Sequence, residues 1–193
     1  MANKAQIFNL ALTLLGQSSI SDPNGSGEAE QACRQVYDLC RQSLLEEHPW
    51  NFAVKRVALA PNSVAPAFGY TRSFDLPSDS LRIISFYNKT EEHREETGKI
   101  LTNAATLNLV YIYDLEDTAL FSPMFVSLMA HDIALAAEYR VTGQTKMQNT
   151  LMEKRRQLLI KAKRVDAQKD QAQKKLKSNR ELALYTPYGN IDK

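Results

Sequence analysis

Four glutamates in one short polar stretch form the densest acidic group in the sequence. The run EEHREETG contains Glu91, Glu92, Glu95 and Glu96 around one histidine and one arginine. Paired carboxylates can catalyse glycoside hydrolysis when burial raises the pKa of one of them. The run has no apolar residue that would bury a carboxyl group, so it favours an exposed hairpin arm over an acid–base pair.

Cysteine and histidine, the other residues with catalytic or metal-binding chemistry, are sparse. The chain has two cysteines and three histidines. Cys33 and Cys40 are seven residues apart in an expected helix, which separates them by about 10 Å along the helix axis, too far for a disulfide. The nearest histidine is His48, and no glycine-rich phosphate loop precedes a helix. We therefore expect reduced, half-buried thiols and no catalytic residue, metal or cofactor.

The strongest charged feature is a basic stretch over residues 154–180. It carries 11 Lys and Arg and two acidic residues. Cationic side chains are enough to contact phosphate. The stretch has no aromatic residue for base stacking, and no helix-turn-helix pattern indicates sequence-specific DNA binding. Three interpretations remain open: a solvated helix face, a phosphate-binding surface, and a surface that pairs with acidic residues of neighbouring copies.

Charge is divided between two parts of the chain. Residues 1–153 carry 12 Lys and Arg against 18 Asp and Glu, a net charge of −6, whereas residues 154–193 carry 12 against 4, a net charge of +8. An acidic body and a basic segment on the same chain make head-to-tail assembly electrostatically favourable.

Length and composition indicate an ordinary globular protein. A chain of 193 residues with 44% hydrophobic and 24% charged residues is long enough to build a core without disulfide or metal staples. No apolar run approaches the roughly 20 residues needed to span a bilayer. The first residues lack the basic start and long apolar stretch of a signal peptide, so we expect no contact with a membrane.

Apolar residues at helical spacing predict four helices, over residues 3–15, 28–48, 118–142 and 145–176. Gly16, Pro49 and Gly143 are expected to end the first three. The apolar stripe of the last helix fades after Val165. The far half of that helix is therefore expected to be solvated or to pack on another chain.

After Pro49 the apolar residues no longer follow helical spacing and instead alternate with polar residues. Trp50 and Phe52 follow the second helix, and we expect both to be buried where the helices meet a sheet. Alternation in residues 107–113 predicts a strand. Three or four such short strands predict one small antiparallel sheet, covered on one side by helices. The predicted fold is α+β: mainly an α-helical bundle with a small inserted antiparallel sheet and a long C-terminal helix.

These elements divide the chain into four expected parts. Residues 1–50 form a helical hairpin of the bundle, and residues 51–114 form the β-rich insertion. Residues 115–177 supply the remaining bundle helices, including the long basic one, and residues 178–193 form a C-terminal tail rich in apolar residues.

Several short motifs occur in an informative order. The first helix ends in LLG, a W-x-F segment at Trp50 and Phe52 follows the second helix, and Tyr70 precedes an L-P-x-D-x-L-R step at residues 76–82. An alanine-rich apolar helix over residues 121–139 follows the strands. Over residues 3–165 this pattern resembles the tail tubular protein A family, the head-to-tail adaptors of short-tailed bacteriophages.

The resemblance implies a structural protein and no enzyme activity. Members of this family form a ring, usually of twelve copies, beneath the portal, in the neck of a virion assembled in the host cytoplasm. The ring extends the channel through which double-stranded DNA passes and presents a platform to the tail nozzle protein. The implied partners are therefore further copies of the chain, the portal, the nozzle and, without sequence preference, DNA. No pattern in the sequence supports carrying over the peptidoglycan hydrolysis associated with some related adaptors.

On this resemblance the candidate sites are surfaces. The basic helix and the tail are expected to contact the portal or neighbouring subunits through cations and apolar anchors: Lys161, Lys163, Arg164, Lys174, Lys175, Lys177, Arg180, Leu182, Leu184, Tyr185 and Tyr188. The four glutamates of residues 91–96 are expected to face the channel or the tail, where negative charge keeps DNA from adhering. The alternatives are a nucleic-acid-binding protein that uses residues 154–180 and, less favoured, a cell-wall hydrolase that uses the glutamates.

Overall fold

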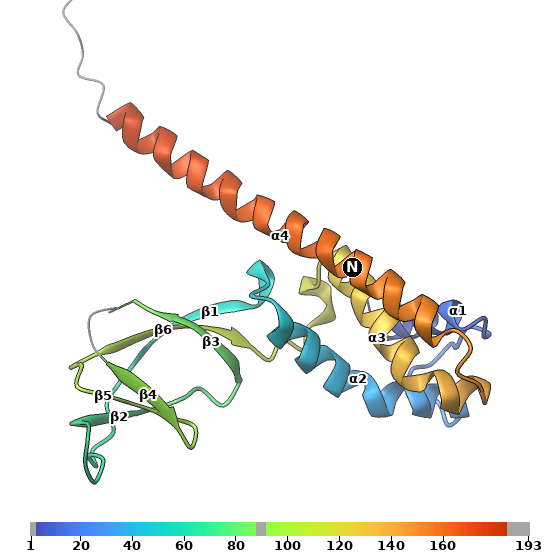
Figure 1. Ribbon diagram of the computed structural model, residues 1–193, viewed down its shortest axis with the longest axis horizontal. Helices are drawn as coiled ribbons and strands as arrows, with labels where there is room; N and C mark the ends of the chain where they lie inside the picture. The colour runs from blue at the N-terminus through green and yellow to red at the C-terminus, as the bar shows by residue number, and fades with distance from the viewer. Residues whose placement is uncertain (1–2, 88–91, 185–193) are drawn as a thin grey trace, which may run out of the picture.

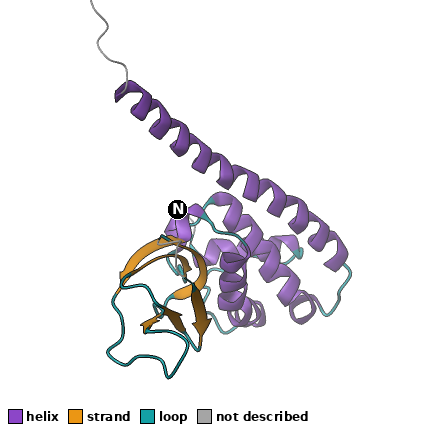
Figure 2. Ribbon diagram, turned by 60° about the vertical axis from the view of Figure 1, so that its left-hand side comes forward, coloured by secondary structure: helices purple, strands orange, loops and turns teal. Residues whose placement is uncertain are grey.

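The computed structural model describes residues 3–87 and 92–184, with side chains described as far as Lys169. Over these residues the fold is α+β, with a helical part and a β part (Figures 1 and 2). The helices are α1 (Lys4–Leu14), α2 (Glu28–Glu47), α3 (Pro123–Thr142) and α4 (Gln148–Leu184), with the short 3₁₀ turns η1 (Asn51–Ala53) and η2 (Thr118–Leu120). The strands are β1 (Val54–Leu59), β2 (Arg72–Asp75), β3 (Ser80–Phe86), β4 (His93–Glu96), β5 (Lys99–Thr102) and β6 (Leu107–Tyr113).

Local side-chain chemistry sets where the helices begin and end. The side chain of Asn3 accepts a hydrogen bond from the Gln6 backbone, and the Gln6 side chain accepts one from the Asn3 backbone, a reciprocal cap for α1. Ser122 caps α3 and Pro123 fills its first turn, so the expected start near residue 118 is instead the separate turn η2. Gly143 ends α3 with a left-handed φ of 68°.

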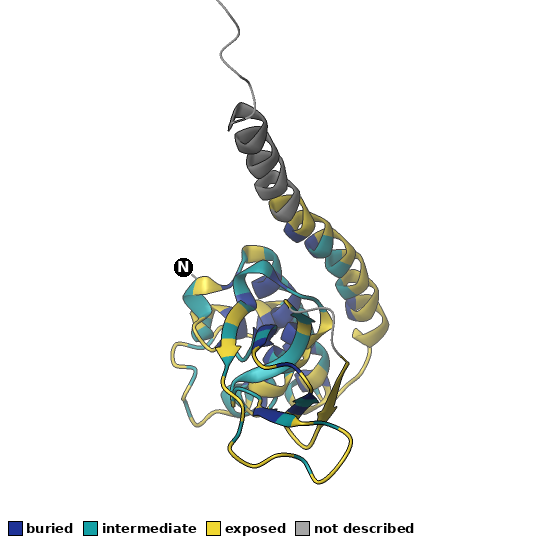
Figure 3. Cartoon of the chain, turned by 90° about the vertical axis from the view of Figure 1, so that its left-hand side faces the viewer, coloured by how far each residue is buried: buried dark blue, intermediate teal, exposed yellow. Residues whose placement is uncertain are grey.

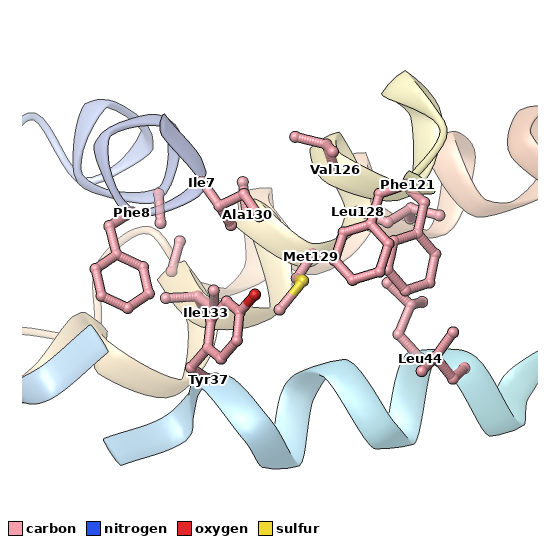
Figure 4. Close-up of a cluster of buried hydrophobic side chains, with 14 of the residues drawn as sticks. Ile7, Phe8, Tyr37, Leu44, Phe121, Val126, Leu128, Met129, Ala130 and Ile133 are labelled. Atoms are coloured by element: carbon pink, nitrogen blue, oxygen red, sulfur yellow. The ribbon is translucent and has the colours of Figure 1, made fainter. Parts of the chain in front are cut away.

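The helical part is organised around α3, which contacts α1, α2 and α4. Its residues Phe125, Leu128, Met129 and Ile133 are completely buried. Figure 4 shows Leu128, Met129 and Ile133 between the surrounding helices, with Tyr37 and Leu44 contributed by α2. Because α3 carries apolar residues on several sides, other helices pack against several of its sides.

Trp50 joins the helical part to the β part. Its side chain is 1% exposed and its indole N–H donates a 2.8 Å hydrogen bond to the Leu44 carbonyl oxygen. Its ring contacts Phe52 and meets Phe125 edge-on at a centroid distance of 5.5 Å. The predicted burial of Trp50 is confirmed, whereas Phe52 is only half-buried.

The β part contains two three-stranded antiparallel sheets. The first sheet has the strand order β1–β6–β3 and the second has the order β2–β5–β4. Phe74 of β2 and Ile100 of β5 are fully buried, and they cluster with Leu109 and Tyr111 of β6. The expectation of one sheet covered by helices is wrong because each sheet has one apolar face and the two faces bury each other.

Strand β6 contributes to both cores. Leu107, Leu109 and Tyr111 belong to the cluster between the sheets, whereas Ile112 belongs to the helical core. The alternating pattern of burial along β6 breaks at Ile112 for this reason. The two parts therefore share a strand as well as the Trp50 junction.

We predict that Trp50→Ala lowers the free energy of unfolding by roughly 3–5 kcal/mol, because it removes a large buried ring and leaves a cavity. Urea denaturation of the variant measures this. Trp50→Phe, which keeps a ring and loses the hydrogen bond to Leu44, should lower the free energy of unfolding by less than Trp50→Ala does. Unchanged stability of Trp50→Ala would contradict the buried junction.

Candidate interaction surfaces

The first half of α4 is anchored on the body by apolar packing. Leu151 and Ala162 are each 1% exposed, and Leu158 and Leu159 are half-buried against the helical core. The buried positions follow one side of the helix, while the opposite side is exposed (Figure 3). This is the amphipathic pattern of a helix that covers a core.

A charged cluster anchors the first half of α4 to two other helices. The Arg155 guanidinium pairs with Asp132 of α3 and, at 2.7 Å, with Glu47 of α2. Lys163 lies 3.9 Å from the same Glu47 carboxylate. Burial raises the pKa of Asp132 against the opposing effect of Arg155, and the hydrogen bond to Asp132 raises the pKa of Arg155. We call these four residues the Arg155 cluster.

Asp166 holds α4 to the segment that follows α2 through polar contacts with His48 and Asn51, which we call the Asp166 clasp. Asp166 is 5% exposed, and its carboxylate accepts a 3.1 Å hydrogen bond from the Asn51 backbone N–H. The Asn51 side chain donates to the Asp166 carbonyl oxygen at 2.9 Å. The Nε2 atom of His48 lies 3.4 Å from the carboxylate. Burial lowers the pKa of His48, and this effect outweighs the opposite influence of Asp166.

Beyond Asp166, the backbone of α4 continues away from the helical part (Figures 1 and 2). Among the candidate cations, Lys161 and Arg164 are exposed, whereas Lys163 belongs to the Arg155 cluster and is already paired within the chain. The candidates Lys174, Lys175, Lys177, Arg180, Leu182 and Leu184 lie on α4, with side chains outside the described part. Tyr185 and Tyr188 lie outside the described residues. Residues 178–184, expected in the tail, belong to α4.

The acidic arm is formed by β4 and β5, joined by a tight turn. Thr97 and Gly98 adopt left-handed φ values of 51° and 71°, as two-residue hairpin turns require. Every residue of β4 is exposed, which confirms the predicted exposed arm for Glu95 and Glu96. Glu96 pairs with Arg94 at 2.7 Å. Glu92 is also exposed, and Glu91 lies outside the described residues.

Sequence analysis missed the Arg155 cluster and the Asp166 clasp. A signal was present, because Arg155, Ala162 and Asp166 follow Leu151 at spacings of four, eleven and fifteen residues, which are all close to whole helical turns. A charged residue in the buried stripe of a helix requires a partner. Which residues supply that partner depends on how α2 and α3 pack, which the spacing does not reveal.

A buried arginine lies on α2. Arg41 is 2% exposed, pairs with Asp114 and donates a 3.0 Å hydrogen bond to the Leu115 carbonyl oxygen. Together with Asp38 and Glu116 it lines an open polar cavity of about 570 Å³. The surface there is acidic, in agreement with the net charge of the body.

The remaining reactive groups of the described part are shielded or dispersed. Cys33 and Cys40 are free, and burial raises the pKa of each thiol to about 11, so neither forms a thiolate readily. Within residues 3–87 and 92–184 no three His, Cys, Asp or Glu side chains gather as metal ligands do, and no described helix has the length and apolarity to cross a membrane. No model of a known protein family matches the sequence, and comparison with curated proteins finds no match either.

We predict that Arg155→Met destabilises the protein by about 2–3 kcal/mol, because Asp132 and Glu47 lose their shared partner in a partly buried site. Arg156→Met is the matched control: this neighbouring arginine is 70% exposed and pairs only with Glu153, and it should cost about 0.5 kcal/mol or less. Equal effects of the two substitutions in chemical denaturation would show that the Arg155 cluster does not anchor α4.

The clasp predicts a pH dependence of stability. The pKa of His48 is lower in the folded chain than its ordinary value of 6.5, so the unfolded chain binds the proton more readily and stability falls as the pH drops through about 6.5. In His48→Gln the free energy of unfolding, measured by urea denaturation, should depend less on pH between about pH 7.5 and pH 5.5. An unchanged pH dependence in His48→Gln would disprove this role.

Proposed function

We propose that this chain is the subunit of a head-to-tail adaptor, a ring between the portal of a short-tailed bacteriophage and its tail nozzle that extends the DNA channel. The geometry of α4 carries the proposal. Among its described side chains, which reach Lys169, the last buried one is Asp166, and the helix continues to Leu184. In this proposal α1, α2, α3 and the anchored half of α4 form a bundle, and the long basic C-terminal helix reaches beyond it to the portal.

The distribution of charge supports a surface that is completed by other chains. Lys161 and Arg164 are exposed on a segment of net charge +8, and the body carries a net charge of −6. Opposite charge on separate surfaces of one subunit favours heterologous contacts, which close into rings. Positive charge on α4 would equally attract an acidic portal surface.

The L-P-x-D-x-L-R step, one of the motifs on which the family resemblance rests, makes contacts that hold the fold together. Asp79 of the L-P-x-D-x-L-R step pairs with Lys55 at 2.6 Å and accepts a 3.0 Å hydrogen bond from the Tyr111 hydroxyl. Arg82 donates a 2.5 Å hydrogen bond to the Glu46 carbonyl oxygen at the end of α2. The step thus ties three strands to a helix, which supports a shared architecture with the adaptor family.

The exposed arm suits a surface that DNA passes or that meets the tail. Glu92, Glu95 and Glu96 are solvent-exposed, and negative charge at a channel wall repels the DNA backbone. Exposure gives no support to the hydrolase alternative, because a general acid needs an environment that raises its pKa. A zymogram with the purified chain tests that alternative.

Non-specific nucleic-acid binding remains the second candidate, and the exposure of Lys161 and Arg164 favours it. Phosphate contacts by these side chains would make the binding weaken steeply with salt. A salt-sensitive shift of DNA by the purified monomer would support this function, and a ring seen by electron microscopy would support the adaptor.

The adaptor proposal predicts the mass of a closed ring when the full chain is mixed with the portal of the same phage and analysed by light scattering. Deleting residues 178–193 should leave the monomer folded, because Leu151, Leu158, Leu159 and Ala162, which pack in the helical core, all precede the deleted segment. The deletion should weaken portal binding by removing part of α4 and the apolar tail. A deletion variant that binds portals with unchanged affinity would disprove the role of the tail, and a full chain that remains monomeric beside portals would disprove the adaptor.

A further inference from the structure

The loop between β1 and β2 presents apolar side chains to solvent. Residues 60–71 contain Phe68, which is 87% exposed, and Val64, which is 75% exposed. The loop carries no charged residue. A fully exposed phenylalanine gains nothing for the folded monomer, since its apolar surface stays in water.

This loop is held in place by hydrogen bonds. The Asn62 backbone N–H donates to the Ser73 carbonyl oxygen at 2.8 Å, and the Asn62 side chain donates to Asp75 at 3.1 Å. At the other end, the Thr71 backbone N–H donates to the Asn103 side chain at 3.0 Å. Binding by a loop that is already ordered loses less conformational entropy than binding by a free segment.

The outer face of the first sheet offers a groove lined by apolar side chains and by Arg56. Leu109 and Tyr111 of β6 face the second sheet, so Val110 between them faces the other way. Two adjoining cavities, of about 410 Å³ and 250 Å³, share Arg56, Tyr87 and Val110. Tyr87 is 76% exposed and Ile84 is 36% exposed. Antiparallel sheets usually turn polar residues to water on such a face. We call this surface the sheet groove.

The loop and the sheet groove lie on opposite sides of the β part. In Figure 1 the first sheet lies on the side of α4, and the loop extends from the second sheet on the other side. Phe68 therefore cannot fill the groove of its own chain in this fold. A surface that fits a different surface of an identical chain gives a heterologous contact, the type that closes into rings.

The charges near the sheet groove and on β4 favour a second copy of the chain as the molecule that fills the groove. A copy whose loop entered the groove would bring its second sheet, with the exposed glutamates Glu95 and Glu96 of β4, toward this chain. Arg56 is exposed and lines the groove. The acidic strand of the incoming copy would then approach this cation, and opposite charges favour that orientation. The Arg56 guanidinium could also lie over the Phe68 ring.

We infer that the Phe68 loop of one copy inserts into the sheet groove of the next copy. The inference rests on the proposed ring and names a surface through which its subunits contact. Phe68 and Tyr87 would bury about 300 Å² between them, a minor share of the roughly 1,600 Å² buried in a stable pair. The contact between two copies is therefore weak by itself, and ring closure lets each copy make it twice.

The test uses exposed positions, so that the variants keep their fold. Phe68→Ser removes the inserted ring, and Arg56→Glu combined with Tyr87→Ser disables the groove. Each should weaken self-association at least tenfold in sedimentation velocity, alone and with portal present. Tyr139→Gln is the control, because Tyr139 is 70% exposed on α3 and its loss should change association less than twofold.

A mixture of Phe68→Ser with the double variant Arg56→Glu and Tyr87→Ser tests the contact more directly than either variant alone. Each variant keeps the surface that the other has lost, so an equimolar mixture, measured at the protein concentration at which the wild-type chain self-associates and at tenfold higher concentration, should form heterodimers and no rings. Unchanged assembly of Phe68→Ser, or a mixture without heterodimers, would overturn this inference and leave the ring proposal intact. A wild-type chain that stays monomeric with and without portals would overturn the ring and this contact together.

Discussion

The packing of α4 on α3 is the contact on which the rest of this account depends. A helix of 37 residues is about 55 Å long. Among its described side chains, which reach Lys169, the buried ones lie between Leu151 and Asp166. A helix gains stability from the apolar face that it covers, and the sequence between Asp166 and Arg180 offers few apolar residues for such a face. Either that segment is solvated, or its partner is another molecule. The charge of the segment, and its position beyond the body, favour a partner.

The anchoring of α4 combines apolar and charged contacts, and the two have different consequences. Leu151 and Ala162 supply burial without fixing a unique register, since neighbouring apolar residues could replace them. Arg155 meets Asp132 and Glu47 at one position along the helix, and Asp166 meets Asn51 at another. We suggest that these polar pairs fix the direction in which α4 leaves the body. A projecting element can serve as a binding arm only if its direction is set.

The sequence predicted the helices well because their apolar periodicity and their stops are local signals. Asn3, Ser122 and Gly143 define helix ends through interactions with residues a few positions away. The two sheets were not predicted because strand pairing is long-range: β2 pairs with β5, and nothing within residues 72–75 specifies that partner. The exposure of Glu95 and Glu96 on β4 was predictable, because the polarity of neighbouring residues is a local signal. The Arg155 cluster was not predictable, because it joins residues of three helices.

An electron cryo-microscopy map of the full chain assembled with its portal would show where α4 lies. We expect a ring of subunits in which α4 remains helical beyond Asp166 and its basic length lies against the portal. A map in which subunits bind the portal through another surface, with α4 free in solvent or folded back over its own body, would contradict the proposed adaptor.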